Sequence, residues 1–264
     1  IQSYAFSECF SLSQLIIPDK VESIGSYSFN KCTSLNSITL PSSLIKIGQN
    51  SFDGITKIDI KGSKKDLPND SFKGCSSLHE ITLSQIKIVG ANAFDGCTSL
   101  TTVSFSHLLE KIELHAFDGI SSLKIIGDIQ NLPNNSFKGC TTLREITISS
   151  SITTIGDNAF DGCISLNNIT LPSSLINIGR NVFDGIITLN IKGDIEFIPE
   201  NSFKECTTLT KISLPDKVKT LKSYAFHECT SLKEINISST IESIEDHVFE
   251  GCTNLTQITI PTSI

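Results

Sequence analysis

The chain has 264 residues, of which 39% are hydrophobic, and a formal net charge of −7 at pH 7. Charges of both signs are interspersed without a basic cluster, which gives little electrostatic support for binding nucleic acid. The longest apolar run is three residues, as in Leu15-Ile16-Ile17, so we expect no membrane insertion within this chain. Tryptophan is absent and tyrosine occurs three times, so the usual aromatic anchors of protein interfaces are scarce.

A phenylalanine recurs along the whole chain at a nearly constant period. The positions are Phe6, Phe29, Phe52, Phe72, Phe94, Phe117, Phe137, Phe160, Phe183, Phe203, Phe226 and Phe249. Successive positions are separated by 22 or 23 residues, except for three steps of 20 residues. Self-similarity at a fixed period of this length is typical of solenoids, in which each repeat forms one coil of the chain.

The offsets within one repeat predict the path of a coil. Ile38 and Leu40 are two residues apart, which places both side chains on one face of an extended strand. Pro41 ends that strand because proline has no N–H for the next ladder bond. Gly48 is expected to change the chain direction before a short helical turn that carries Phe52 inward. Each coil then buries its apolar residues only against the coils before and after it.

Three coils of 20 residues depart from this pattern in the same way. Isoleucine replaces a cysteine of the longer coils, and the strand begins three residues earlier. Proline takes the place of the usual glycine. The isoleucines are Ile55, Ile120 and Ile186, and the prolines are Pro68, Pro133 and Pro199.

The repeat resembles the BspA-like leucine-rich repeats. The stretches that carry the resemblance include CTSLNSITLPSSLIKIGQNSF, from Cys32 to Phe52, and CISLNNITLPSSLINIGRNVF, from Cys163 to Phe183. The resemblance covers the whole chain and departs from the family pattern in the three short coils. It implies a cell-surface protein involved in adhesion and host contact, because most members of the family are of that kind.

We therefore predict an α/β repeat solenoid. It is expected to be a right-handed leucine-rich-repeat coil with a parallel β-sheet on the concave face and short helical turns opposite. Residues 1–264 should form a single solenoid of about eleven to twelve coils, interrupted within a repeat at both ends.

All nine cysteines lie three residues after a repeated phenylalanine. They are Cys9, Cys32, Cys75, Cys97, Cys140, Cys163, Cys206, Cys229 and Cys252. Isoleucine replaces cysteine at this position in the short coils, which favours buried thiols that act as small hydrophobic groups. Disulfides between adjacent coils are an alternative, because stacked strands bring equivalent residues within bridging distance. A metal site is disfavoured because no CxxC pair is present.

The sequence contains no motif of a known catalytic type. The five histidines fall in different columns of the repeat and are expected to be surface residues, and no GxSxG, Walker or HExxH motif occurs. We therefore predict that the chain is not an enzyme and binds neither a cofactor nor a metal.

Strand residues that point away from the core are the candidate ligand-binding positions. In one column, Thr39, Asp59 and Thr82 are expected to lie level on successive strands. Threonine and serine suit strands even without a binding function, because their β-propensity is high. Charged residues that interrupt the threonine pattern are therefore the better candidates. They are Lys57, Asp59, Glu80, Lys124, Glu145, Lys211 and Glu234.

The leading functional hypothesis is a non-enzymatic recognition or adhesion module that binds a protein or a glycan at the cell surface or outside the cell. One alternative is a cytoplasmic scaffold or regulator that acts through protein–protein interaction, since nine thiols suit a reducing compartment. Another is a structural spacer within a longer array. Apolar residues at uncovered terminal coils also predict end-to-end self-association.

Overall fold

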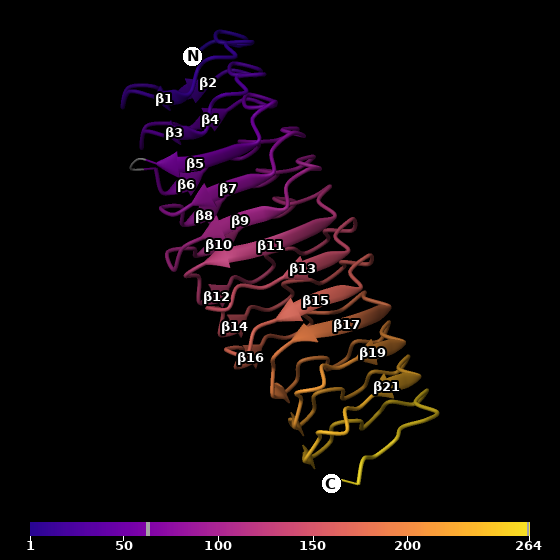
Figure 1. The fold of residues 1–264 in the computed structure, drawn as a ribbon. Coiled ribbons are helices and arrows are strands. Elements are labelled where there is room, and N and C mark those ends of the chain that lie inside the picture. Colours follow the sequence, from indigo (N-terminus) through magenta and orange to yellow (C-terminus); the bar gives the residue numbers. More distant parts are fainter. Residues whose placement is uncertain (62–63, 263) are drawn as a thin grey trace. The chain divides into compact units, whose positions relative to one another are not determined.

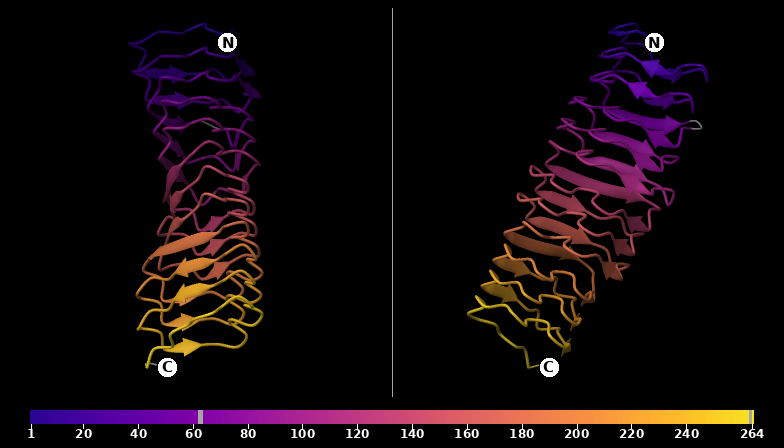
Figure 2. Two further views of the ribbon diagram at one scale, coloured as in Figure 1. Left: turned by 90° about the vertical axis from the view of Figure 1, so that its right-hand side faces the viewer. Right: turned by 180° about the vertical axis from the view of Figure 1, so that it is seen from behind.

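The structure is a computed structural model that describes residues 1–61, 64–262 and 264. It divides into two compact units, Ile1–Ile129 and Gln130–Ile264. Each unit is a parallel β-solenoid in which successive coils stack along the chain (Figures 1 and 2). The single solenoid of eleven to twelve coils, and the interruption of the repeat at both ends, stay predictions.

Each coil from that of Phe6 to that of Phe226 contributes one long strand, and the long strands of a unit form a parallel sheet, as predicted. In the first unit they pair in the order of the sequence: β1 (Gln14–Ile16), β3 (Ser37–Thr39), β5 (Lys57–Lys61), β7 (Glu80–Leu83), β9 (Thr102–Phe105) and β11 (Ser122–Gly127). In the second unit the order is β13 (Glu145–Thr147), β15 (Asn168–Leu171), β17 (Thr188–Gly193), β19 (Lys211–Ser213) and β21 (Glu234–Asn236).

A second set of two-residue strands follows the long strands and forms short parallel ladders. The first unit contains β2 (Ser23–Ile24) paired with β4 (Lys46–Ile47), and β6 (Asp66–Leu67), β8 (Ile88–Val89) and β10 (Lys111–Ile112) paired in that order. The second unit contains β12 (Asn131–Leu132), β14 (Thr154–Ile155) and β16 (Asn177–Ile178), and then β18 (Phe197–Ile198), β20 (Thr220–Leu221) and β22 (Ser243–Ile244).

These ladders are interrupted at the short coils, between β4 and β6 and between β16 and β18. In a regular coil the glycine after the short strand donates its N–H to the preceding coil, as Gly48 does to the carbonyl of Ile24 at 2.8 Å. A Cβ on Gly48 would lie 2.4 Å from the nitrogen of Ser26, so the backbones approach too closely for any side chain. Pro68 and Pro199 occupy this position in the short coils and have no N–H to donate.

The predicted short helical turns are wrong, because the described residues contain no helix. The segment around each repeated phenylalanine is a series of turns that contains two left-handed residues, with φ of +58° at Tyr27 and +60° at Lys31. The N–H groups of Tyr27, Phe29 and Lys31 donate to carbonyls of the next coil rather than to their own segment. A helix requires negative φ throughout and uses its N–H groups internally, so the bonds between coils exclude it.

The same left-handed backbone recurs at two positions of every coil. Two residues before the phenylalanine, φ is positive at Tyr4, Tyr27, Asn50, Asp70, Asn92, His115, Asn135, Asn158, Asn181, Asn201, Tyr224 and His247. Two residues after it, φ is positive at Glu8, Lys31, Gly54, Gly74, Gly96, Gly119, Gly139, Gly162, Gly185, Glu205, Glu228 and Gly251. Asparagine and glycine predominate there because they tolerate this region at the lowest cost.

The core of each unit is a set of stacked side chains from equivalent positions. In the first unit the rings of Phe29 and Phe52 are stacked with centroids 5.5 Å apart. In the second unit Phe160 lies between Phe137 and Phe183, at centroid distances of 5.5 and 6.1 Å. Phe160 has no exposed surface. Each ring therefore contacts mainly its counterparts in adjacent coils, as the repeat predicts.

The short coils change the strand register by two residues. Asp59 of β5 lies opposite Ser37 of β3 on one side and opposite Thr82 of β7 on the other. Thr39 therefore lies level with Lys61, and the expected alignment of Thr39 with Asp59 is wrong. Because side chains alternate with a period of two, a shift of two residues leaves every side chain on its original face.

No helix in the described part of the chain has the length and apolar character that a membrane span requires.

We predict that Phe160→Ala lowers the free energy of unfolding by about 3–5 kcal/mol, because a buried aromatic ring leaves a cavity between neighbours that cannot close it. Thr170→Ala, which changes an outward-facing residue of β15, should cost less than about 1 kcal/mol. Urea unfolding followed by circular dichroism measures both. Similar losses for the two variants would contradict the assignment of inward and outward positions.

Candidate binding surfaces

The long strands place alternate residues inside and outside each unit. In β5, Ile58 and Ile60 are buried, whereas Lys57 and Lys61 are exposed and Asp59 is half-buried. The same alternation places every charged candidate on the outward face of its strand. Lys57, Asp59, Glu80 and Lys124 lie there in the first unit, and Glu145, Lys211 and Glu234 lie there in the second.

In the first unit most of these charges are joined in ion pairs. The Nζ of Lys57 lies 2.8 Å from Oε1 of Glu80 on the adjacent strand. The carboxylate of Asp59 lies 3.6 Å from the Nζ of Lys61 on its own strand. Among the residues that the structure describes, Lys124 is the candidate without an ion-pair partner. The outward face therefore presents paired charges beside one unpaired lysine.

The second unit shows the same tendency. Lys211 contacts Glu234 on the adjacent strand at 3.0 Å, and Glu145 contacts Lys192 at 3.8 Å. All four side chains are about half exposed, so each pair contributes about 0–1 kcal/mol to stability. These pairs therefore set the pattern of charge that a partner meets more than they hold the fold together.

Two outward-facing lysines were missed at the level of sequence. Lys61 and Lys192 lie on the long strands of two short coils, because β5 and β17 continue beyond their second inward residue. The available signal was the alternation itself, which continues through Ile60-Lys61 and Ile191-Lys192. Both lysines pair with predicted candidates, Asp59 and Glu145.

Four of the five histidines lie beside acidic side chains. His115 and His247 occupy the same repeat position, so the expectation that all five histidines fall in different columns is wrong. In each, Nδ1–H donates to the carboxylate three residues later, that of Asp118 at 2.9 Å and that of Glu250 at 2.6 Å. Within the described residues, no group of three or more His, Cys, Asp or Glu side chains could hold a metal ion.

The cysteines are thiols, and seven of the nine are buried, as expected for small hydrophobic groups. The Cys97 thiol donates to the carbonyl of Phe72 at 3.1 Å, and the Cys229 thiol donates to that of Phe203 at 2.9 Å. Burial raises the pKa of the Cys75 and Cys206 thiols to about 12, because the thiolate would lose its hydration. These thiols are therefore unsuited to nucleophilic chemistry near neutral pH.

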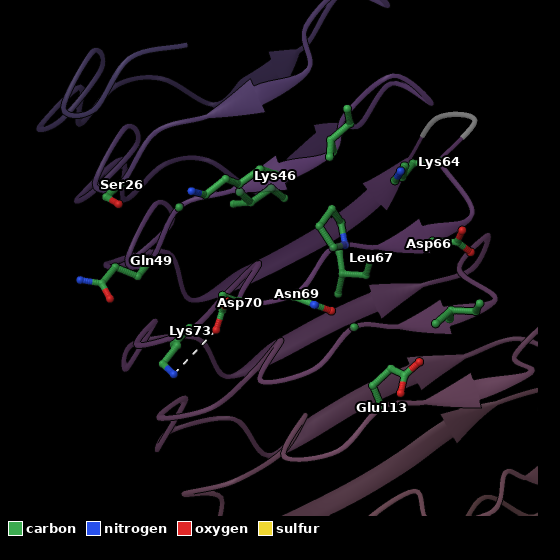
Figure 3. Close-up of a pocket in the computed structure, with 16 residues that line it drawn as sticks. Ser26, Lys46, Gln49, Lys64, Asp66, Leu67, Asn69, Asp70, Lys73 and Glu113 are labelled. Atoms are coloured by element: carbon green, nitrogen blue, oxygen red, sulfur yellow. Dashed lines mark ion pairs between the residues drawn. The ribbon is translucent and has the colours of Figure 1, made fainter.

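A surface hollow, which the sequence did not predict, lies where the ladder is interrupted between β4 and β6. It has a volume of about 850 Å³ and is lined by residues from Ser26 to Glu113, including Lys46, Lys64 and Lys73. Figure 3 shows its side chains, with Lys73 paired to Asp70 at 3.7 Å. A smaller hollow of about 420 Å³ lies at the equivalent interruption in the second unit and is lined by residues from Asn134 to Asn201.

The sequence matches the BspA type leucine rich repeat region, with six copies over residues 1–124, 83–190 and 185–264. The chain belongs to this family. The matched regions together span the whole sequence, so the resemblance seen in the repeat is confirmed.

Several solved structures of leucine-rich-repeat proteins are similar to this chain. A leucine rich cell surface protein from Faecalibacterium prausnitzii is 25% identical over 97% of this chain and 81% of its own, with a TM-score of 0.36. A T. pallidum leucine rich repeat protein is 27% identical over 83% of this chain and 77% of its own, with a TM-score of 0.31. No curated protein matches the sequence. Because both TM-scores are low, the family assignment rests on the repeat match alone.

The raised thiol pKa values predict a loss of stability at alkaline pH. Below about pH 8 both folded and unfolded thiols keep their protons, so they add no pH dependence. Above that pH the unfolded thiols ionise while the folded ones do not, which favours unfolding. Between pH 8 and pH 10 each of Cys75 and Cys206 should remove about 1–2 kcal/mol from the free energy of unfolding.

Urea unfolding at the two pH values measures this loss. The double variant Cys75→Val/Cys206→Val should lose less stability than the parent protein over the same interval, because lysine and tyrosine titrations are common to both. An equal loss would show that these thiols ionise as readily in the folded state as in the unfolded state.

Proposed function

We propose that this chain is a non-enzymatic recognition module that binds a protein or glycan partner through the outward faces of its long strands. The observation that carries the proposal is the contrast between the two faces of one sheet. Equivalent inward positions repeat the same residue, as with Ile146, Ile169 and Ile191, which lie level on adjacent strands and are all buried. Equivalent outward positions carry polar and charged residues that vary, as with Glu145, Asn168 and Asn190.

The solenoid geometry makes such a face suitable for recognition. Adjacent parallel strands are about 4.8 Å apart, so outward side chains form rows at fixed spacing on a rigid support. Ordered side chains lose little conformational freedom when a partner binds. Side chains that vary along these rows then provide specificity, whereas the uniform inward columns provide stability.

We further propose that the module acts at the cell surface, as its family resemblance implies. A cytoplasmic scaffold is the second candidate, favoured by nine cysteines that are all thiols. Counting reactive thiols after denaturing the native material without reductant distinguishes the two. Nine reactive thiols favour the scaffold, and fewer than nine favour an oxidising extracellular location.

A charge swap tests whether the outward face recognises a partner. Lys211→Glu combined with Glu234→Lys keeps the net charge and can keep the ion pair, so the melting temperature should change by less than about 2 °C. The pattern of charge offered to a partner is reversed. On arrays of extracellular proteins and of glycans, at least one partner bound by the parent protein should bind the swapped protein about tenfold more weakly.

The matched control is the swap Lys219→Glu with Glu196→Lys. This ion pair, at 3.4 Å, also joins adjacent coils of the second unit but lies beside the short strands. It should leave partner binding unchanged. Equal binding by the parent protein and both swapped proteins, or no saturable partner on either array, would refute recognition by the outward face.

A further inference from the structure

Five asparagines of the chain stand in the acceptor sequence for N-linked glycans, which is Asn-x-Ser or Asn-x-Thr with x other than proline. They are Asn69, Asn134, Asn168, Asn236 and Asn254. The structure places Asn168 and Asn236 on the long strands β15 and β21, and the other three in turns. Because acceptor asparagines are expected in surface loops, the three in turns are the candidates for modification.

The side-chain hydrogen bonds separate these three candidates, because the carboxamide nitrogen is the atom that carries the sugar. Nδ2 of Asn254 donates to the carbonyl of Thr230 at 2.7 Å. Oδ1 of Asn69 and Oδ1 of Asn134 instead each accept a backbone N–H of the next coil, both at 2.9 Å. Within the described residues, no hydrogen bond uses Nδ2 of Asn69 or of Asn134. A glycosylated amide keeps its oxygen as an acceptor, so both bonds between coils are compatible with a sugar on the nitrogen.

Space for a sugar is open beside both asparagines, and both are exposed. Asn69 lines the hollow of about 850 Å³ in the first unit, and Figure 3 shows it among the lining side chains. Asn134 lines the hollow of about 420 Å³ in the second unit. Hollows of about 300–1,000 Å³ accommodate small molecules. The first sugar therefore meets open volume rather than packed side chains.

The two asparagines occupy the same position of the repeat, directly after the proline of a short coil. The serine that completes each acceptor sequence, Ser71 or Ser136, is buried and donates to the carbonyl of that proline. Ser202 of the third short coil is buried and bonded in the same way, but Glu200 replaces the asparagine there. Because the serine hydroxyl is inaccessible once the coil has formed, a sugar has to be added before the chain folds.

We propose that Asn69 and Asn134 are acceptors of N-linked glycans when the chain is secreted. In this transfer Nδ2 bonds to the anomeric carbon of a lipid-pyrophosphate-linked oligosaccharide, and the bond from that carbon to the phosphate oxygen breaks. The lipid pyrophosphate leaves, the amide gives up one proton to solvent, and nothing is oxidised or reduced. The inference rests on the proposed cell-surface location. The two glycans stand two residues after the short strands β6 and β12, so they leave the outward face of the long strands free.

The test is secretion of the whole chain from cultured eukaryotic cells behind a signal peptide. An amidase then removes the glycans in water enriched in heavy oxygen, which converts each modified asparagine into a labelled aspartate. Mass spectrometry of the peptides should find the label at Asn69 and Asn134 in the majority of molecules.

A matched pair of variants separates the acceptor sequence from the buried hydroxyl that it contains. Ser71→Ala/Ser136→Ala keeps both asparagines but removes both acceptor sequences, so it should abolish the label at the two sites. The control Ser202→Ala removes the equivalent buried hydroxyl from the coil that has no acceptor sequence, and it should keep both glycans.

A second measurement tests whether the folded coils accommodate the sugars. The secreted chain and the same chain made without glycans in a bacterial cytosol should have melting temperatures within about 2 °C of each other, because no hydrogen bond between coils is lost. A larger fall in the glycosylated chain would overturn the inference. So would the absence of label at Asn69 and Asn134, or label that persists in Ser71→Ala/Ser136→Ala.

These outcomes are independent of the proposed recognition function. The signal peptide sends the chain into the secretory pathway, and no partner takes part in the measurement. Absence of label therefore refutes the glycan sites and leaves recognition by the outward face untouched, whereas absence of a partner on the arrays leaves the glycan sites untouched.

Discussion

The spacing of hydrogen-bonded parallel strands is the constraint on which the rest of this structure depends. It fixes the rise between coils at about 4.8 Å, so each inward side chain must pack on its counterpart one coil away. Phenylalanine meets this condition by stacking, as between Phe203 and Phe226 at 5.0 Å. Gly48 meets it by having no side chain where two backbones touch. Uniform inward columns follow directly from this geometry.

The short coils satisfy the same constraint by a different route. Their long strands extend to five or six residues. Each of these strands pairs with the preceding strand in a register that is shifted by two residues from its register with the following strand. The inward isoleucines therefore remain inward. The short strands are only two residues long and cannot shift register in this way. Pro68 and Pro199 also lack the backbone N–H that would continue the ladder of short strands. The hollows lie where the long strands of adjacent coils stay paired but the short strands do not.

The strand spacing does not restrict the identity of the outward-facing side chains. Many of these side chains are charged. Ion pairs such as Lys57–Glu80 and Lys211–Glu234 join residues 23 positions apart because adjacent coils place them side by side. Such pairs neutralise each other, so a partner meets a pattern of charge rather than a net field.

The sequence by itself determined the period, the inward columns, the parallel long strands and the outward position of all seven charged candidates, because burial repeats every coil and alternates within each strand. It did not determine the turns around Phe29, since a helix and a series of turns with left-handed residues place that ring inward equally well. Only the tertiary structure decided the register at Asp59, the partners of Asp59 and Glu145, and the hollow beside Pro68. Each of these depends on hydrogen bonds and contacts between coils, which a pattern within one coil does not encode.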